Sequence, residues 1–191
     1  MSTTLAASSP STTVLPAGTW TIDSSHSQVE FAVKHLMIST VRGRFGDVKG
    51  TIRINEAEPN RSQVEIEVPT ASIDTRAEQR DAHLRSPDFF HVERYPAMKF
   101  VSERIEGDVN GEFKLIGDLT IRDTTKEVVL EAEFQGKTRD PWGGDRMGFE
   151  AQGKINRKDF GLNWNQALDA GGWVLGDDIK MTIAVELVKQ A

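Results

Sequence analysis

Two histidines lie close together in the stretch DAHLRSPDFFHVERYP, residues 81–96. His83 and His91 are eight residues apart, among acids and arginines, and they flank the paired Phe89 and Phe90. Imidazole and carboxylate groups can bind a metal ion, transfer protons in catalysis, or form a polar cap over an apolar ligand. The residue types allow all three chemistries, so the choice depends on the elements that position them.

A metal site or a hydrolytic site has little support in this stretch. His83 and His91 lack helical i, i+4 spacing, and the chain has neither an HExxH motif nor a cysteine. A fold could still bring His26 or His35 to them, but we expect no metal and no cofactor. A hydrolytic site built on Asp81, His83 and a serine would need a nucleophile turn such as GxSxG, which is missing. We expect His83 and His91 to hold a helix and its following turn by hydrogen bonds.

His35 differs from the other histidines because it falls on the apolar face of an alternating strand, beside Val33 and Met37. A polar group buried there costs about 1–3 kcal/mol unless it finds a partner. Two roles stay open, a hydrogen-bonded core residue or the polar contact for a ligand head group. His26, in DSSHS, precedes that strand and is expected to fix a turn.

The composition is that of a folded globular chain and not of a disordered one. Of the 191 residues, 38% are hydrophobic and 27% are charged. The net charge of −6, without any basic cluster, gives no support for nucleic-acid binding. Because the chain has no cysteine, it can form no disulfide, thiolate metal site or cysteine nucleophile.

The first residues are rich in Ser, Thr, Ala and Pro and contain no Lys or Arg up to Trp20. We predict a disordered tail over residues 1–17 and a single domain over residues 18–191. A secretory signal would need a basic start and a longer apolar core. No apolar run approaches the roughly 20 residues that a membrane helix requires. We therefore expect a soluble, cytoplasmic protein without a membrane span.

Alternation of apolar and polar residues with period two runs through nearly the whole chain, which predicts β-strands. The apolar rows are Val29-Phe31-Val33-His35-Met37, Val48-Gly50-Ile52-Ile54, Val64-Ile66-Val68, Met98-Phe100, Phe113-Leu115-Gly117-Leu119-Ile121, Val128-Leu130-Ala132-Phe134, Met147-Phe149-Ala151-Gly153-Ile155 and Ile179-Met181-Ile183-Val185-Leu187.

About eight strands with one apolar and one charged face indicate an antiparallel sheet that is wet on one side. Closing such a sheet into a barrel buries the apolar face and removes the exposed edges. Short connections at 106–112 and 122–127 favour an up-and-down order, so we predict an all-β, eight-stranded antiparallel up-and-down β-barrel; a sandwich is the alternative. The interior of such a barrel can be filled by side chains or can hold one small ligand.

Three glycines occupy inward positions where the alternation expects a large side chain: Gly50, Gly117 and Gly153. One interpretation is that they relieve bends where a small barrel curls. The other is that the missing side chains leave a channel along the barrel axis. The two interpretations are compatible.

Two regions break the β pattern. In 74–86, Thr75 followed by Glu78 forms a possible capping box and Pro87 ends the helix, which predicts a short helix lying over a surface. The segment 157–178 is a long Gly-rich loop with three large aromatic residues. Loops of this length usually carry function or cover an opening.

Four blocks of the sequence resemble the YceI-like family, which is lipocalin-like in architecture and associated with polyisoprenoid lipids. The blocks are IDSSHSQVEFAVKH with VRGRF, ASIDTRAEQRDAHLRSPDFFHVERYPAMKFVS, GDLTIRDTTKEV, and GFEAQGKINRKDFGLNWNQ continuing through GGWVLGDDI. The resemblance implies a barrel with a short helical lid segment, and it allows a homodimer. It also implies that Arg80, Asp81, His83 and Arg85 form an outer hydrogen-bonding layer while Phe89 and Phe90 turn inward.

We expect a soluble carrier that holds a long-chain polyisoprenoid, such as a polyprenyl chain or a quinone tail, inside the barrel, and not an enzyme. The expected ligand-binding residues are Phe31, Val33, His35, Met37, Phe45, Ile66, Phe89, Phe90, Phe100, Leu119, Phe149, Phe160 and Trp164. The first alternative is an enzyme acting on a hydrophobic substrate, with His35 or His83 as the acid/base group. The second is a scaffold or stress-related protein whose barrel is full.

Overall fold

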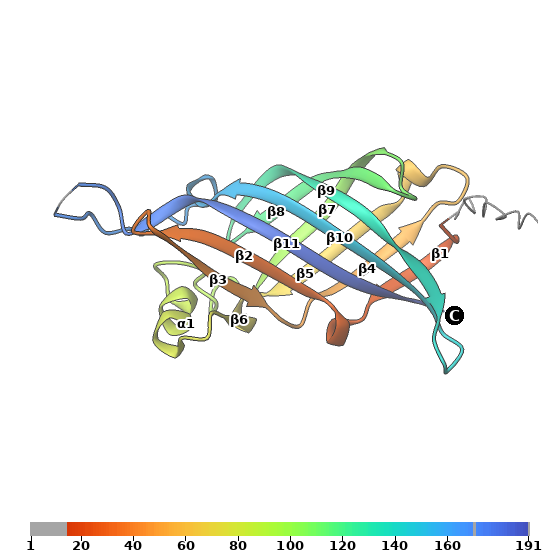
Figure 1. The fold of residues 1–191 in the computed structure, drawn as a ribbon, viewed down its shortest axis with the longest axis horizontal. Helices are drawn as coiled ribbons and strands as arrows, with labels where there is room; N and C mark the ends of the chain where they lie inside the picture. The colour runs from red at the N-terminus through yellow and green to blue at the C-terminus, as the bar shows by residue number, and fades with distance from the viewer. Residues whose placement is uncertain (1–14, 170, 191) are drawn as a thin grey trace, which may run out of the picture.

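The fold is a single curled antiparallel sheet with one short α-helix at one end, as seen in a computed structural model that describes residues 15–169 and 171–190 (Figure 1). The predicted tail, residues 1–17, lies mostly outside the described residues. Within them, Leu15 is buried and belongs to the core, three residues ahead of the predicted start of the domain.

The described residues form eleven strands, one α-helix and four 3₁₀ turns. The strands are β1 (Gly18–Ile22), β2 (Gln28–His35), β3 (Ser39–Phe45), β4 (Lys49–Ile54), β5 (Gln63–Pro69), β6 (Ile73–Asp74), β7 (Ala97–Gly107), β8 (Glu112–Ile121), β9 (Thr124–Arg139), β10 (Asp145–Asn156) and β11 (Leu175–Lys189). The helical elements are η1 (Ser24–His26), η2 (Pro59–Arg61), η3 (Thr70–Ser72), α1 (Glu78–Arg85) and η4 (Arg157–Phe160).

Eight of the strands in the described chain close into a ring in the order β1-β4-β5-β7-β8-β9-β10-β11, because β1 pairs with both β4 and β11. After η1 the chain continues as β2, which pairs with the same strand β11, and β3 returns beside β2 before leading into β4. Each neighbouring pair is antiparallel. The predicted eight-stranded up-and-down β-barrel is therefore confirmed, and the sandwich alternative is excluded.

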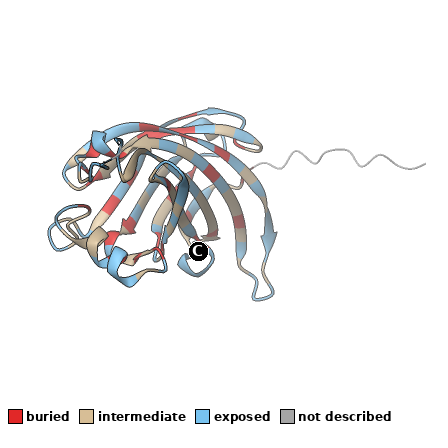
Figure 2. Cartoon of the chain, turned by 60° about the vertical axis from the view of Figure 1, so that its left-hand side comes forward, coloured by how far each residue is buried: buried red, intermediate tan, exposed pale blue. Residues whose placement is uncertain are grey.

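The apolar rows predicted from the alternation point into the barrel. Phe100, Leu115 and Leu130 are at most 8% exposed and sit in one core cluster. Figure 2 shows buried and exposed segments alternating along the strands as the sheet curls around its interior. Burying each such side chain contributes about 1.5–3 kcal/mol, which makes the closed barrel the stable arrangement of this pattern.

Gly117 relieves a close approach between two strands and does not line a channel. At Gly117 a Cβ atom would lie 2.8 Å from the Cα of Ser102 and the ring of Phe100, and even nearer to the carbonyl oxygen of Val101. The pairing of β7 with β8 shifts register at this point, between Ser102 and Arg104, so the glycine sits opposite a β-bulge. The bend interpretation holds for Gly117, and the channel interpretation is wrong there.

The prediction that Met37 continues the inward row of β2 is also wrong. The strand ends at His35, and the next two residues, Leu36 and Met37, have φ values of 52° and 60°. These left-handed conformations turn the chain back into β3, and they leave Met37 65% exposed. A turn built from two left-handed residues cannot be predicted from alternation, because alternation assumes an extended backbone.

Helix α1 begins without the predicted capping box. Its N-cap is Ala77, and no side chain bonds there. Instead, the Thr75 hydroxyl donates to Asp81 and accepts from Arg80 Nε at 2.7 Å, so the helix reaches back to the chain that precedes it. Arg85 donates to the carbonyl oxygen of Ile73 at 2.7 Å, which fixes the helix against β6. None of the helices in the described chain is long and apolar enough to cross a membrane.

Candidate ligand-binding cavity

An apolar cavity of about 420 Å³ lies inside the barrel at the end that α1 covers. Its volume is within the range of 300–1,000 Å³ that is typical of small-molecule sites. The lining is almost entirely hydrocarbon. The predicted ligand-binding residues that it brings together are Phe31, Val33, His35, Phe45, Ile66, Phe89, Phe90, Phe100, Leu119 and Trp164.

The three other predicted residues lie elsewhere. Met37 is exposed in the turn between β2 and β3. Phe160 is 2% exposed and belongs to the core cluster without lining the cavity. Phe149 lines a second, smaller cavity of about 90 Å³ toward the other end of the barrel.

The two cavities are neighbours within the same barrel interior. Both are lined by Ile66, Leu130 and Ile183, which come from three separate strands. These three side chains therefore stand where the larger chamber meets the smaller one. A linear molecule that filled the larger chamber would have to pass them to extend further.

Aromatic side chains form the wall of the larger cavity at the end that α1 covers. The ring of His83 meets Trp164 edge-on at 4.7 Å and Phe89 edge-on at 5.1 Å between centroids. In the same wall, the ring of Phe90 meets that of Phe45 edge-on at 5.5 Å between centroids. Edge-to-face pairs of this kind contribute about 0.5–1.5 kcal/mol beyond the area that they bury. The predicted inward orientation of the paired phenylalanines is confirmed.

His83 and His91 make contacts that hold α1 and the turn after it together. His83 Nε2 lies 2.9 Å from the carboxylate of Asp88, one turn beyond the helix. The backbone N–H of His91 donates to Ser86, and its ring meets Tyr95 edge-on at 5.9 Å. These contacts fit the structural role that the sequence indicated for both histidines.

A buried arginine that sequence reasoning missed organises the loop whose Trp164 packs against α1. Arg157 is 2% exposed and donates to the carbonyl oxygens of Leu162, Trp164 (2.9 Å) and Gly176 (2.9 Å). It also forms an ion pair with Asp177 at 3.1 Å. Burial lowers the pKa of the Arg157 guanidinium, while the neighbouring carboxylate opposes that shift. In the sequence NRKDFG this arginine has no signal that distinguishes it from a surface residue.

The polar or charged residues that line the cavity are few: His35, Gln79, Arg80, His83, Lys99 and Arg157. Arg80 and Arg157 already donate to protein oxygens, and His83 faces Asp88. Among the described residues, the imidazole of His35 has no hydrogen-bond partner. The cavity is therefore suited to enclose an apolar molecule and to offer one or two polar contacts at one end.

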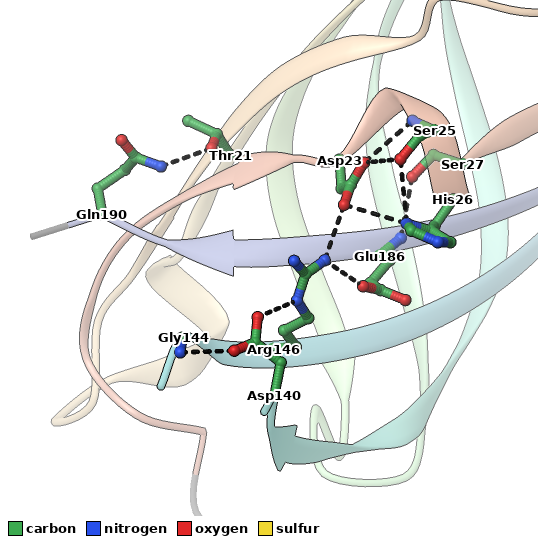
Figure 3. A network of polar contacts seen from close by, with 10 residues as sticks. All are labelled: Thr21, Asp23, Ser25, His26, Ser27, Asp140, Gly144, Arg146, Glu186 and Gln190. Atoms are coloured by element: carbon green, nitrogen blue, oxygen red, sulfur yellow. Dashed lines mark hydrogen bonds and ion pairs between the residues drawn. The ribbon is translucent and has the colours of Figure 1, made fainter. Parts of the chain in front are cut away.

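A separate polar network ties strands together at the far end of the barrel (Figure 3). Arg146 Nη1 lies 2.7 Å from the carboxylate of Asp23 and also pairs with Glu186, while its Nε donates to Asp140 at 2.8 Å. The geometry of Asp23, His26 and Glu186 could also hold a metal ion. The guanidinium of Arg146 already occupies the carboxylates of this group, so it carries no metal assignment.

Comparison with known proteins agrees with this architecture. The family model described as a YceI-like domain matches residues 20–187. Protein YceI of Escherichia coli O157:H7 is 39% identical over 168 residues, which cover 88% of this chain and 84% of that protein. The crystal structure of a YceI protein from Campylobacter jejuni is 33% identical, has a TM-score of 0.69, and covers 83% of this chain and 90% of that one. A polyisoprenoid binding domain from Saccharophagus degradans shares the fold, at 14% identity and a TM-score of 0.68, over 90% of this chain and 98% of that one.

Proposed function

The chain belongs to the YceI-like family, and from this membership we propose that it binds a long, linear, apolar lipid of the polyisoprenoid class inside the barrel. The observation that carries the proposal is the cavity of about 420 Å³, whose lining is almost entirely hydrocarbon with few polar groups. An apolar cavity with few polar groups suits a hydrocarbon molecule with a single head group. The description of the related domain as polyisoprenoid-binding supports the same class of ligand.

Desolvation is the expected source of affinity. Each buried CH₂ group contributes about 0.8 kcal/mol before entropic costs are subtracted. Since the cavity wall offers few polar partners, the hydrocarbon chain is expected to dominate affinity and the head group to set orientation.

The direct test is to extract the protein, purified from its own host, with organic solvent and to identify co-purifying lipid by mass spectrometry. Binding of a polyprenyl alcohol is then measured for two matched variants. Val33 lines the cavity and is 6% exposed, whereas Val101 is 50% exposed on the outer wall. Val33→Trp is expected to lower affinity by tenfold or more while Val101→Trp leaves it unchanged. Equal affinities in two folded variants would contradict binding in the barrel.

A second candidate function is acid/base catalysis on a hydrophobic substrate, because the His83–Asp88 pair borders the cavity. It is distinguished by turnover of the bound lipid that disappears in His83→Gln or His35→Gln. Release of the lipid chemically unchanged supports a carrier.

We also propose that the protein is cytoplasmic and that it forms a homodimer. Fractionation of the host cell tests the first of them. Sedimentation equilibrium of the purified protein tests the second.

A further inference from the structure

Three large apolar side chains project into solvent at the end of the barrel where the larger cavity lies. Met37 is 65% exposed, Ile38 is 83% exposed and Trp173 is 52% exposed; we call these three residues the rim patch. The backbone N–H of Leu36 donates to the carbonyl oxygen of Val174 at 2.8 Å, so the turn and the loop that carry them lie side by side. Figure 1 shows both segments extending beyond the sheet at the same end.

The rim patch is continuous with the cavity. Val174 directly follows Trp173, His35 lies two residues before Met37, and both line the cavity wall together with Leu175. The pairing of His35 with Leu175 joins these two stretches in the sheet. The exposed apolar surface therefore begins where the cavity lining ends.

Charge is nearly absent from the segments that carry the rim patch. Residues 36–41 and 160–176 contain a single charged residue, Asp169, in a chain of which 27% is charged. The hairpin connections at the opposite end, EGDVNGE and RDPWGGDR, are rich in charge. Charged tips are the ordinary way to keep loops soluble, so the uncharged tips require another explanation.

The turn that presents Met37 and Ile38 is also conformationally costly. Leu36 and Met37 both have positive φ, and a hairpin turn of this kind is normally built from Asn and Gly. A side chain held in the left-handed region costs about 1 kcal/mol or more. Apolar residues at two such positions are not selected for turn stability.

Backbone groups in these tips are bonded within the protein. The N–H of Ile38 donates to His35, that of Val174 donates to Gln166, and that of Leu168 donates to Gly172. A segment that enters a lipid interface must satisfy its backbone donors internally, because hydrocarbon supplies no partners. Trp, like Tyr, is in addition enriched at the boundary between head groups and acyl chains.

We propose that the rim patch docks the barrel on the surface of a lipid bilayer. The three side chains insert at the boundary between head groups and acyl chains, with the cavity opening beside them. An apolar molecule can then move between bilayer and barrel without crossing water. The identity of the transferred molecule rests on the proposed function, whereas docking on the bilayer does not.

The test is sedimentation of the full chain with phosphatidylcholine vesicles. We expect the wild type to bind, with little change on adding salt because the patch is uncharged. Combining Met37→Asn, Ile38→Asn and Trp173→Ser should lower the partition coefficient at least tenfold, about 1.4 kcal/mol. Trp142→Ser is the matched control, because Trp142 is 87% exposed at the opposite end. It should leave partitioning unchanged.

Far-UV circular dichroism and the melting temperature establish that each variant is folded, and Trp173→Ser alone provides a milder second variant. The proposal is overturned if the wild type stays in the supernatant, or if Trp142→Ser loses as much binding as the triple variant. Polyprenyl alcohol binding measured in detergent separates the two proposals. If it persists while vesicle binding is absent, the docking idea fails and the proposed function stands.

Discussion

A single buried guanidinium holds the loop that covers one side of the cavity. Arg157→Leu would remove the donors that satisfy Leu162, Trp164 and Gly176 and would leave Asp177 without its buried partner. We expect the free energy of unfolding to fall by about 3 kcal/mol or more. Lys158→Leu is the control, since Lys158 pairs with the same carboxylate at the surface and should cost under about 1 kcal/mol. Chemical denaturation measures both, and similar losses would show that the buried contacts contribute little.

The unbonded imidazole of His35 permits a test of head-group contact. If the ring hydrogen-bonds a ligand, His35→Leu should lower affinity about tenfold while the barrel stays folded. Calorimetric titration with a polyprenyl alcohol and with the matching hydrocarbon separates head-group contact from chain contact. Unchanged affinity with raised stability would identify His35 as a tolerated polar residue of the wall.

At the scale of elements, the inward glycines differ in what surrounds them. Gly117→Ala would place Cβ against the backbone of β7, which cannot move without breaking the ladder, and should cost about 1–3 kcal/mol. Gly153→Ala would meet the ends of Leu130, at 2.6 Å, and Met181, at 3.2 Å, which can rotate away. We therefore expect the larger loss of urea stability in Gly117→Ala. The reverse order would mean that the bulge opposite Gly117 is soft.

The ion pairs of Arg146 with Asp23, Asp140 and Glu186 should make the far end of the barrel sensitive to acid. Hydrogen bonds from Ser25, Arg146 and His26 hold the pKa of Asp23 well below its usual range, and Arg146 with the Gly144 amide lowers the pKa of Asp140. A carboxyl group whose pKa is lower in the folded state stabilises the fold above its unfolded pKa of about 3.9 and loses that contribution as the pH falls below it.

We expect the wild type to lose stability steeply below about pH 4. Arg146→Met should be less stable near neutral pH and should show a shallower decline in acid. Unfolding free energies measured across that range test both statements. An identical acid slope in the two proteins would show that other carboxyl groups control acid unfolding.

The alternation of apolar and polar residues correctly predicted the strands and their inward faces. It failed where the backbone departs from extended geometry. Rows such as Leu115 and Leu130 point inward because each strand has one wet face. Met37 was misplaced because β2 ends at His35 and Met37 itself lies in the left-handed turn that follows. The capping box at Thr75 was wrong because Asp81 and Arg80, brought near by the helix, compete for its hydroxyl. Arg157 could not be found at all, since its partners are backbone carbonyls assembled only by the folded loop.

At the scale of the whole molecule, the junction between the two cavities should limit the length of the ligand. Ile183→Trp would narrow the passage that Ile183 forms with Ile66 and Leu130. Affinity for an octaprenyl chain is expected to fall by tenfold or more, about 1.4 kcal/mol, while a farnesyl chain, short enough for the larger cavity, keeps its affinity. Val129→Trp, on the outer wall, is the control. Equal losses for both chain lengths would argue against a length-limiting junction.

The closure of the barrel has a consequence for how the protein is made. Strand β11 pairs with β10 along one edge and with β2 and β1 along the other, so the strand synthesised last joins the first to the rest. Until residues 175–189 have left the ribosome, the edges of β10 and β2 lack their partner and remain able to pair with other chains. Contacts between the two ends of a chain also form slowly, because a long loop must close first. Nascent chains of this protein are therefore expected to depend on chaperones late in synthesis, and a chain that stops before Leu175 should aggregate instead of forming a smaller barrel.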